Sequence, residues 1–159
     1  MSLSASKILS EVEHRQLQET LEKYEKGNFR DSTLIWVLLH TGARVSEVLA
    51  IRKCDIIEQG MRVFIRGLKN SNDREIPMTP FLFNRLKVLA EKLEDSGKIF
   101  PIGYNRAREI WCEWRPAKKR IHSLRHYRAV EIFKKTKNVL LVKRVLGHKD
   151  LATTMIYLE

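Results

Sequence analysis

Two polar residues near one third of the way along this 159-residue sequence have types and spacing that suit phosphate chemistry. Arg44 follows Thr41-Gly42 at an expected helix entrance, and Glu47 comes three positions later. One interpretation is an ordinary i,i+3 ion pair on a helix surface. The other is a guanidinium held by its neighbours and aimed at phosphate, because its planar fork matches two phosphate oxygens.

Residues 122–126 (HSLRH) are the densest group of such side chains. His122 and Arg125 lie three apart at an expected helix start, so both can face one ligand. His122 and His126 lie four apart, which is also the spacing of a helical zinc pair. However, Ser123 stands where such a pair carries a glutamate, and no third ligand is evident. We therefore expect no metal, while capping and packing roles for the histidines stay open.

Three further residues could take part in the same chemistry or be purely structural. Lys69 lies in the turn of an expected hairpin, where a lysine is normally solvated but can also reach a nucleic-acid groove. His148 follows Leu146-Gly147 at a helix end, where a histidine often only complements the helix dipole. Tyr157, nine residues later, has apolar neighbours, as core tyrosines do. Taken singly, none of them is decisive.

The elements that must position these residues are mostly helical. Ser10 and Glu13 form a capping box, which predicts a helix to about Glu25. Asp31 or Ser32 can cap the next helix. Periodicity and cap residues predict helices over 33–40, 45–51, 80 to about 97, 104–114, 123–136, 138–146 and 153–158.

Between these helices the periodicity becomes alternating. Residues 61–66 alternate between the two faces of a strand, 67–73 are rich in turn residues, and 74–77 form a second short strand. The pattern predicts a β-hairpin. We therefore expect a mainly α fold of the α+β class, a multi-helix core with one small antiparallel sheet, as a single domain over 1–159.

The positive charge of the chain is concentrated in one stretch. The formal net charge is +11, and residues 115–150 hold twelve Lys and Arg residues against only Glu131 and Asp150. A concentrated basic stretch suggests a docking face, with nucleic acid favoured over an acidic protein or a membrane surface. Within this stretch we expect DNA contacts from Lys118, Lys119, Arg120 and Arg128.

Nothing in the sequence points to a membrane or to an oxidising compartment. Cys54 and Cys112 match no metal-ligand spacing and do not suggest a disulfide scaffold. No apolar run approaches the roughly 20 residues that a bilayer span needs, and the N-terminus lacks a signal-peptide core. We expect a cytoplasmic protein.

Together, the polar residues resemble the signature of the tyrosine recombinase (phage integrase) family in order and spacing. That family pairs an arginine in an A-R-x-S-E box with H-x-x-R, a downstream L-G-H, and a tyrosine nine residues past that histidine. The matching segments are TGARVSEVLAI at 41–51, HSLRH at 122–126 and LGHKDLATTMIY at 146–157. Lys69 stands eight residues before Pro77, as the family's hairpin lysine typically does, and the resemblance covers about residues 8–158.

The resemblance implies a mechanism in which DNA strands are cut and rejoined through a 3′-phosphotyrosine. Arg44 and Arg125 would clamp the non-bridging oxygens of one phosphodiester and stabilise the transition state. Tyr157 would attack phosphorus and free a 5′-hydroxyl. Because each step exchanges one phosphodiester for another, neither ATP, a metal ion nor another cofactor is expected.

The resemblance also implies roles for the remaining residues. Lys69 would protonate the departing 5′-oxygen, and His122 would assist proton movement at the nucleophile. His148 would hydrogen-bond the scissile phosphate, and Glu47 would orient the arginine-bearing segment.

Double-stranded DNA is the implied partner, with a tetramer on DNA in the full-length context and a monomer for the isolated domain. Family members normally carry an N-terminal DNA-binding domain and a tail after the tyrosine, so we expect a shortened form or a minimal variant here. Two alternatives stay open. One is a topoisomerase that uses the same chemistry without exchanging partners, and the other is a basic DNA-binding module with a vestigial site.

Overall fold

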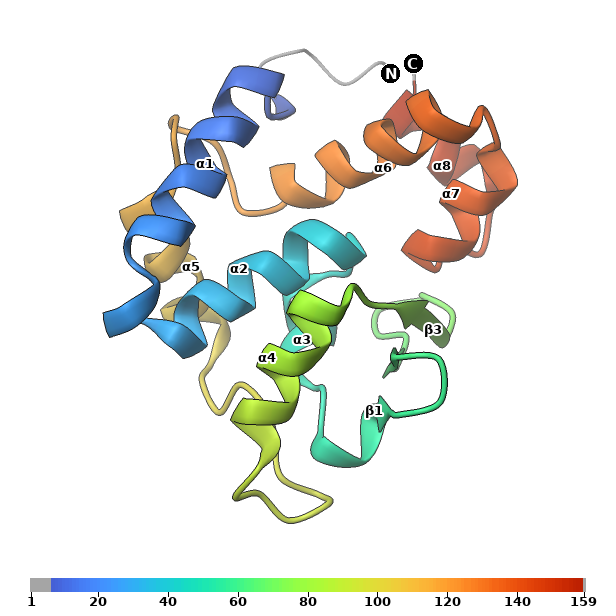
Figure 1. Ribbon diagram of the computed structural model, residues 1–159. Helices are drawn as coiled ribbons and strands as arrows, with labels where there is room; N and C mark the ends of the chain where they lie inside the picture. The colour runs from blue at the N-terminus through green and yellow to red at the C-terminus, as the bar shows by residue number, and fades with distance from the viewer. Residues whose placement is uncertain (1–6, 159) are drawn as a thin grey trace.

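Helices make up most of the molecule, and a small sheet lies at one side of them (Figure 1). The computed structural model describes residues 7–158. Its α-helices are α1 (Glu11–Lys23), α2 (Phe29–Thr41), α3 (Val45–Leu49), α4 (Pro80–Ala90), α5 (Tyr104–Trp114), α6 (Ser123–Thr136), α7 (Val139–Leu146) and α8 (Leu151–Leu158). Short 3-10 turns are η2 (Glu25–Gly27) and η3 (Lys53–Asp55). The predicted fold class is confirmed.

Cap residues set several of the helix starts where the sequence predicts them. The Ser10 hydroxyl accepts a hydrogen bond from the backbone of Glu13 at 3.1 Å, and the Glu13 carboxylate accepts one from the backbone of Ser10 at 2.8 Å. Thr79 caps α4 ahead of Pro80, and its hydroxyl accepts a hydrogen bond from the backbone of Leu82 at 3.3 Å. These side chains satisfy backbone N–H groups that have no partner inside the helix.

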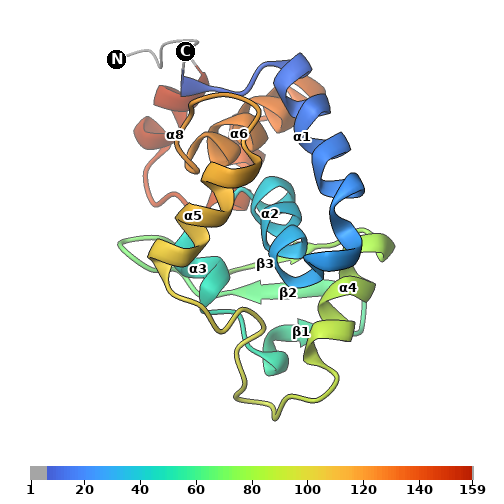
Figure 2. The ribbon, with the colours of Figure 1, turned by 90° about the vertical axis from the view of Figure 1, so that its left-hand side faces the viewer.

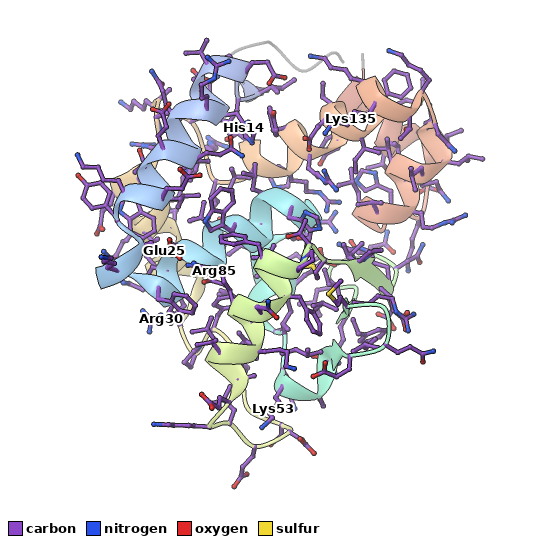
Figure 3. All side chains as sticks on the ribbon, in the orientation of Figure 1. His14, Glu25, Arg30, Lys53, Arg85 and Lys135 are labelled. Carbon is purple, nitrogen blue, oxygen red and sulfur yellow. The ribbon has the colours of Figure 1, made fainter. Side chains whose placement is uncertain are left out.

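Helix α2 begins earlier than predicted, at Phe29 instead of Thr33. Asp31 and Ser32 lie inside its first turn and do not cap it. The Ser32 hydroxyl donates to the carbonyl of Phe29 at 3.1 Å and accepts a hydrogen bond from Arg85 at 2.7 Å. Arg85 reaches this turn from α4 (Figure 3). The Ser32 hydroxyl therefore takes part in a contact between distant segments instead of a local cap.

The sheet has one strand more than the sequence predicted. Its antiparallel strands, in spatial order, are β1 (Ile56–Ile57), β2 (Arg62–Ile65) and β3 (Arg74–Pro77). Val63 in the middle strand pairs with Ile56 on one side and Ile76 on the other. Alternate residues of β3 are buried, so Arg74 and Ile76 both face inward. A two-residue strand such as β1 is too short to show alternation in sequence.

Two clusters of apolar side chains hold these elements together. The larger cluster lies around α2, which packs against α3, α4, α5 and α6. The smaller one, between α6 and α7, consists of Ala129, Ile132, Val142 and Leu146, and Tyr157 of α8 packs against it. Helices α6 and α8 lie at the opposite end of the molecule from β1 (Figure 2). No helix between residues 7 and 158 has the length and apolar character to cross a membrane.

Candidate active site

Arg44 is held at both its backbone and its side chain. Gly42 ends α2 with a φ of +65°, and Arg44 then stands at the N-terminal cap of α3. Its backbone N–H donates to Glu47 Oε1 at 2.9 Å, and its guanidinium donates to the Ser71 hydroxyl in the β2–β3 turn. Glu47 thus orients the arginine-bearing segment, as the sequence predicts, and the half-buried guanidinium is fixed by a second segment.

The Glu47 carboxylate also forms a buried ion pair that the sequence motifs do not predict. Its partner is Arg74, with Nη1 2.8 Å and Nη2 3.3 Å from the two carboxylate oxygens. Arg74 Nε donates to the carbonyl of Val145 at 2.8 Å. The pair therefore joins α3, β3 and the end of α7. The signal in the sequence is an arginine that shares the inward face of a strand with Ile76, because a buried charge requires a partner.

Arg125 is anchored from α6 to the ends of two other helices. Its Nη1 donates to the carbonyl of Gly42 at 2.8 Å, and its Nη2 donates to the carbonyl of Leu146 at 3.0 Å. Only 1% of the residue is exposed, and its Nε is buried without a partner among the described residues. Burial lowers the pKa of Arg125, while nearby Tyr157 raises it.

The side chains of His122 and Tyr157 meet, one at the start of α6 and the other on α8. His122 is the residue before α6, and its Nε2 lies 3.2 Å from the Tyr157 hydroxyl on α8. Part of the His122 ring is open to solvent, yet burial of the rest, followed by the charges of Arg125 and Arg44, lowers its pKa to about 4. The imidazole is therefore neutral near pH 7, so one ring nitrogen is a proton acceptor.

A second histidine packs against both members of this pair. The His126 ring centroid lies 4.8 Å from that of His122 in an edge-to-face arrangement, and 4.4 Å from that of Tyr157. Burial, together with nearby positive charge, lowers the pKa of His126 to about 4. In the described part of the chain, no three His, Cys, Asp or Glu side chains are grouped to hold a metal ion. His122 and His126 both lie against Tyr157, one beside its hydroxyl and the other beside its ring.

His148 approaches the cluster from the end of α7. It follows Gly147, which has a φ of +74°, and 3% of it is exposed. Its Nδ1 lies 2.9 Å from the Thr154 hydroxyl, and its Nε2 is buried with no partner among the described residues. Burial, followed by nearby guanidinium groups of which Arg125 is the first, lowers the pKa of His148 to about 3. Its ring lies 5.2 Å from that of Tyr157.

Lys69 is exposed in the β2–β3 turn, with a φ of +51°. The turn itself lies against the end of α7, since Asn72 donates to the carbonyl of Gly147 at 2.8 Å and Ser71 forms a β-bridge with His148. Between residues 7 and 158, no hydrogen bond or ion pair joins the Lys69 ammonium to another residue. The structure places the turn at the cluster and leaves the lysine side chain in solvent.

The cluster carries two arginines that form no ion pair with a carboxylate of the described residues. Among the described residues, neither Arg44 nor Arg125 forms an ion pair, because Glu47 is paired with Arg74. A charge removed from water destabilises a fold unless an opposite charge meets it. This arrangement favours the binding of an anion between the two guanidinium groups.

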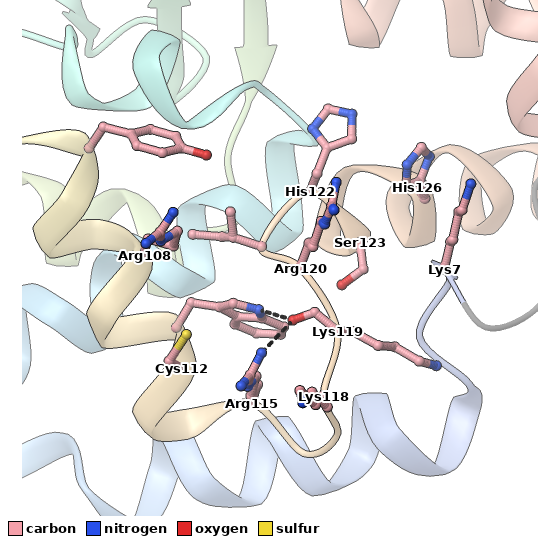
Figure 4. A pocket seen from close by; sticks show the side chains of 13 residues that line it. Lys7, Arg108, Cys112, Arg115, Lys118, Lys119, Arg120, His122, Ser123 and His126 are labelled. Carbon is pink, nitrogen blue, oxygen red and sulfur yellow. Dashed lines mark hydrogen bonds between the residues drawn. The ribbon is translucent and has the colours of Figure 1, made fainter.

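A basic cavity of about 1070 Å³ opens beside His122 (Figure 4). Its walls are α5, the loop of residues 115–122 and the first turn of α6, and none of the described residues that line it is acidic. The loop is held by Trp111, whose indole N–H donates to the carbonyl of Lys119 at 2.7 Å. The basic residues that line the cavity are Lys7, Arg108, Arg115, Lys118, Lys119 and Arg120. We refer to this cavity as the basic groove.

The four predicted DNA-binding residues differ in their surroundings. Lys118 and Arg120 are exposed in the basic groove. Lys119 Nζ instead donates to the carbonyl of Ile8 and to the Glu13 carboxylate, which ties the loop to the start of α1. Arg128 lies on α6 and is paired at 2.8 Å with the carboxylate three positions later. Their contacts with DNA stay predictions.

Two guanidinium groups, three imidazoles and a tyrosine hydroxyl lie close together, a combination that suits phosphoryl transfer. The chain belongs to the phage integrase family, whose family model matches residues 7–159. This confirms the resemblance seen in the sequence.

Three similar proteins illustrate the match. The tyrosine recombinase XerA of Saccharolobus solfataricus is 30% identical, over 95% of this chain and 51% of its own length. The crystal structure of the XerH site-specific recombinase bound to its difH substrate has a TM-score of 0.74 at 25% identity, over 95% of this chain and 49% of that one. The catalytic domain of bacteriophage HP1 integrase shares the fold, with a TM-score of 0.71 at 24% identity, over 94% of this chain and 85% of that one. The chain spans about half the length of the curated relatives it matches.

Proposed function

We propose that this chain is the catalytic domain of a site-specific DNA recombinase, which cleaves and rejoins DNA through a covalent 3′-phosphotyrosine intermediate. The observation that carries the proposal is a tyrosine hydroxyl 3.2 Å from a neutral imidazole, near two guanidinium groups that have no carboxylate partner in the described part of the chain. The basic groove beside this centre supports double-stranded DNA as the partner. The XerH structure, which holds a DNA substrate, supports the same partner.

In the first step the phenolic oxygen of Tyr157 attacks the scissile phosphorus. The bond from phosphorus to the tyrosine oxygen forms, and the bond to the 5′-oxygen breaks. Arg44 and Arg125 hold the two non-bridging oxygens and meet the charge that develops on them. Since only 1% of Arg125 is exposed, phosphate binding requires the side chains that cover it to shift. Rejoining is the reverse attack, by a 5′-hydroxyl on the phosphotyrosine.

Two proton transfers accompany this step. His122 accepts the proton of the Tyr157 hydroxyl, and Lys69 donates a proton to the departing 5′-oxygen. In the DNA-free protein burial lowers the pKa of His122, and the charges of Arg125 and Arg44 lower it further. A bound phosphate would offset those charges and make His122 a better base at the moment it is needed.

The reaction needs no external energy, because the phosphotyrosine conserves the phosphodiester bond. The two arginines stand where other phosphoryl-transfer enzymes place metal ions, so EDTA should leave cleavage unchanged. Activity that is lost on chelation and restored by Mg²⁺ or Zn²⁺ would reject this mechanism.

The decisive experiment is covalent capture on a nicked duplex from which the cleaved 5′ fragment diffuses away. The 159-residue chain should form an adduct that resists denaturation, and Tyr157→Phe should bind the same DNA and form none. An adduct in the variant would show that another residue is the nucleophile. Relaxation of supercoiled DNA without strand exchange between two duplexes would indicate a topoisomerase instead.

We further propose that the full-length protein assembles as a tetramer on DNA, whereas this domain alone is a monomer. Apolar side chains on the last two helices support a further contact, since exposed apolar clusters favour association. These side chains are Leu140, Leu151, Met155 and Ile156. Light scattering with and without a DNA site would measure the assembly state.

A further inference from the structure

Thr154 makes a buried hydrogen bond that no role assigned so far explains. It lies on α8 one turn before Tyr157, and its hydroxyl is 2.9 Å from His148 Nδ1. Thr154 is fully buried and His148 is 3% exposed. The other ring nitrogen, His148 Nε2, is also buried and has no partner among the described residues.

Comparison with the other helical threonines indicates that the Thr154 hydroxyl can donate in this hydrogen bond. In this protein the hydroxyl of a helical threonine typically donates to the carbonyl four residues earlier, which uses up its proton. The threonines with this bond are Thr20, Thr33, Thr41 and Thr136. Within residues 7–158 the Thr154 hydroxyl makes no such bond, and its partner is His148 Nδ1. Its proton is therefore available to that nitrogen.

The direction of the bond decides which ring nitrogen carries the proton. His148 is neutral at physiological pH, because burial and the surrounding guanidinium groups lower its pKa to about 3. A neutral imidazole has one N–H and one bare nitrogen. If Thr154 donates to Nδ1, the ring proton is on Nε2. The opposite tautomer would leave a bare Nε2, which repels phosphate oxygens.

We infer that Thr154 is a positioning residue that holds His148 in the Nε2–H tautomer, so that Nε2 donates a hydrogen bond to a non-bridging oxygen of the scissile phosphate. This role rests on the proposed function, whereas the tautomer itself is a property of the DNA-free protein. The same bond also fixes α8 against His148. Thr154 and Tyr157 lie three residues apart on that helix, so the bond sets the position of the nucleophile as well.

Three variants separate the hydroxyl from the packing of the side chain. Thr154→Val keeps the shape and removes the hydroxyl, and Thr154→Ser keeps the hydroxyl. Thr20→Val is the matched control, because the same hydroxyl is removed from a helical threonine on α1, outside the cluster. Each variant is compared with the unaltered chain in its unfolding free energy and its affinity for DNA.

The first measurement is the tautomer of His148, from nitrogen-15 NMR of the imidazole rings without DNA. We expect Nε2–H in the unaltered chain, in Thr154→Ser and in Thr20→Val, and loss of that preference in Thr154→Val. An Nδ1–H signal in the unaltered chain would overturn the inference whatever the activity.

The second measurement is the single-turnover rate of adduct formation on nicked DNA. Loss of one donor to a transition-state oxygen typically slows a reaction about 10²–10³-fold. We expect Thr154→Val to be slowed by about that factor at unchanged DNA affinity, with Thr154→Ser close to the unaltered rate. If the His148 tautomer changes in Thr154→Val but the rate does not, Thr154 has no role in catalysis. If the unaltered chain shows Nε2–H but forms no adduct, the proposed function fails and the tautomer assignment stands.

Discussion

The buried polar side chains of this protein differ in whether their nitrogen atoms have hydrogen-bond partners. Arg74 and Arg85 are buried, and their guanidinium groups are hydrogen-bonded to carboxylate, hydroxyl or carbonyl oxygens. Arg125 Nε, His126 Nδ1 and His148 Nε2 are buried without partners among the described residues. An unsatisfied buried polar atom destabilises a fold by about 1–3 kcal/mol. Three of them around one tyrosine indicate a site arranged for a ligand.

Replacement of Lys69 should affect cleavage in a way that depends on the leaving group. In Lys69→Ala the 5′-oxygen leaves without a proton, and loss of a general acid typically slows such a step about 10²–10⁴-fold. A sulfur in place of the bridging oxygen leaves as a thiolate, which needs little protonation. The variant should therefore recover most of its cleavage rate on the sulfur substrate, measured by adduct formation.

Tyr157→Phe is the control for this experiment and should stay inactive on both substrates. If sulfur fails to restore Lys69→Ala, the lysine is not the acid. Its exposed position, without a hydrogen bond or ion pair between residues 7 and 158, would then be that of an ordinary turn residue.

Arg125→Lys should be severely impaired although the charge is retained. The guanidinium donates to two backbone carbonyls while it presents further N–H groups, and a single ammonium cannot reproduce that geometry. We expect a loss of at least about 10²-fold in the single-turnover rate, as for a removed oxyanion donor. A lysine variant with near-normal rate would show that only charge matters at this position.

Stability should fall as the pH drops below about 6.5, the value at which histidines of the unfolded chain titrate. Burial lowers the pKa of all five histidines, His14, His40, His122, His126 and His148, in the folded protein. Between about pH 4 and 6.5 the unfolded state therefore binds more protons, and the free energy of unfolding decreases with decreasing pH. Urea denaturation from pH 7.5 to 5 would measure the slope.

His126→Phe should make that slope shallower, because the variant keeps a ring against Tyr157 but cannot bind a proton. The difference corresponds to at most one proton. Equal slopes for the variant and the unaltered chain would mean that His126 titrates alike in the folded and unfolded states.

At the scale of the elements, predictions succeed where local signals decide and fail where distant contacts do. Helices α5 and α6 span the predicted residues 104–114 and 123–136. Helix α4 ends at Ala90, short of the predicted end near Gly97, although Leu93 still packs against the core. Leucines at helical spacing predict which side chains are buried, but they do not predict whether the backbone stays helical.

In the candidate site, too, local sequence signals predict some residues, whereas contacts between distant segments determine others. Motif spacing predicts Arg44, His122, Arg125, His148 and Tyr157, which the fold brings together. The same spacing cannot show which residues support them. The supporting contacts from Arg74, Ser71 and Thr154 depend on the packing of β3, α7 and α8.

The turn between α7 and His148 should not tolerate a side chain at Gly147. A φ of +74° costs a non-glycine residue roughly 1–2 kcal/mol. An added Cβ would also lie 2.6 Å from Arg74 Nη1, so the arginine that holds Glu47 would have to move. Gly147→Ala should lower the free energy of unfolding by more than the backbone term alone and slow adduct formation, measured by urea denaturation and covalent capture.

Gly103→Ala is the matched control for this substitution. Gly103 precedes α5 with a φ of −89°, and an added Cβ would meet nothing within 4 Å. Its stability and cleavage should stay close to those of the unaltered chain. Equal effects at both glycines would show that the approach of Arg74 to Gly147 is unimportant.

For the molecule as a whole, the distribution of charge matters more than its total. Of the net charge of +11, all but +1 comes from residues 115–150. The fold gathers part of this excess, with Arg108 and Lys7, into the basic groove next to the candidate active site. Phosphates on either side of the scissile one would follow this groove. Other members of the stretch, such as Arg128, are paired with carboxylates instead.

The salt dependence of DNA binding should therefore distinguish neighbouring basic residues of one loop. Each phosphate that a cation of the protein neutralises adds about 0.9 to the slope of log affinity against log salt on duplex DNA. Lys118→Gln with Arg120→Gln removes two exposed cations of the basic groove and should flatten the slope by about 0.9 for each phosphate that is no longer neutralised.

Lys119→Gln is the control, because its ammonium is bonded to Glu13 and to the carbonyl of Ile8. It should leave the slope unchanged and lower the free energy of unfolding by about 1 kcal/mol. A flatter slope in Lys119→Gln alone would mean that this lysine leaves α1 to bind DNA, and an unchanged slope in the double variant would place the docking face elsewhere.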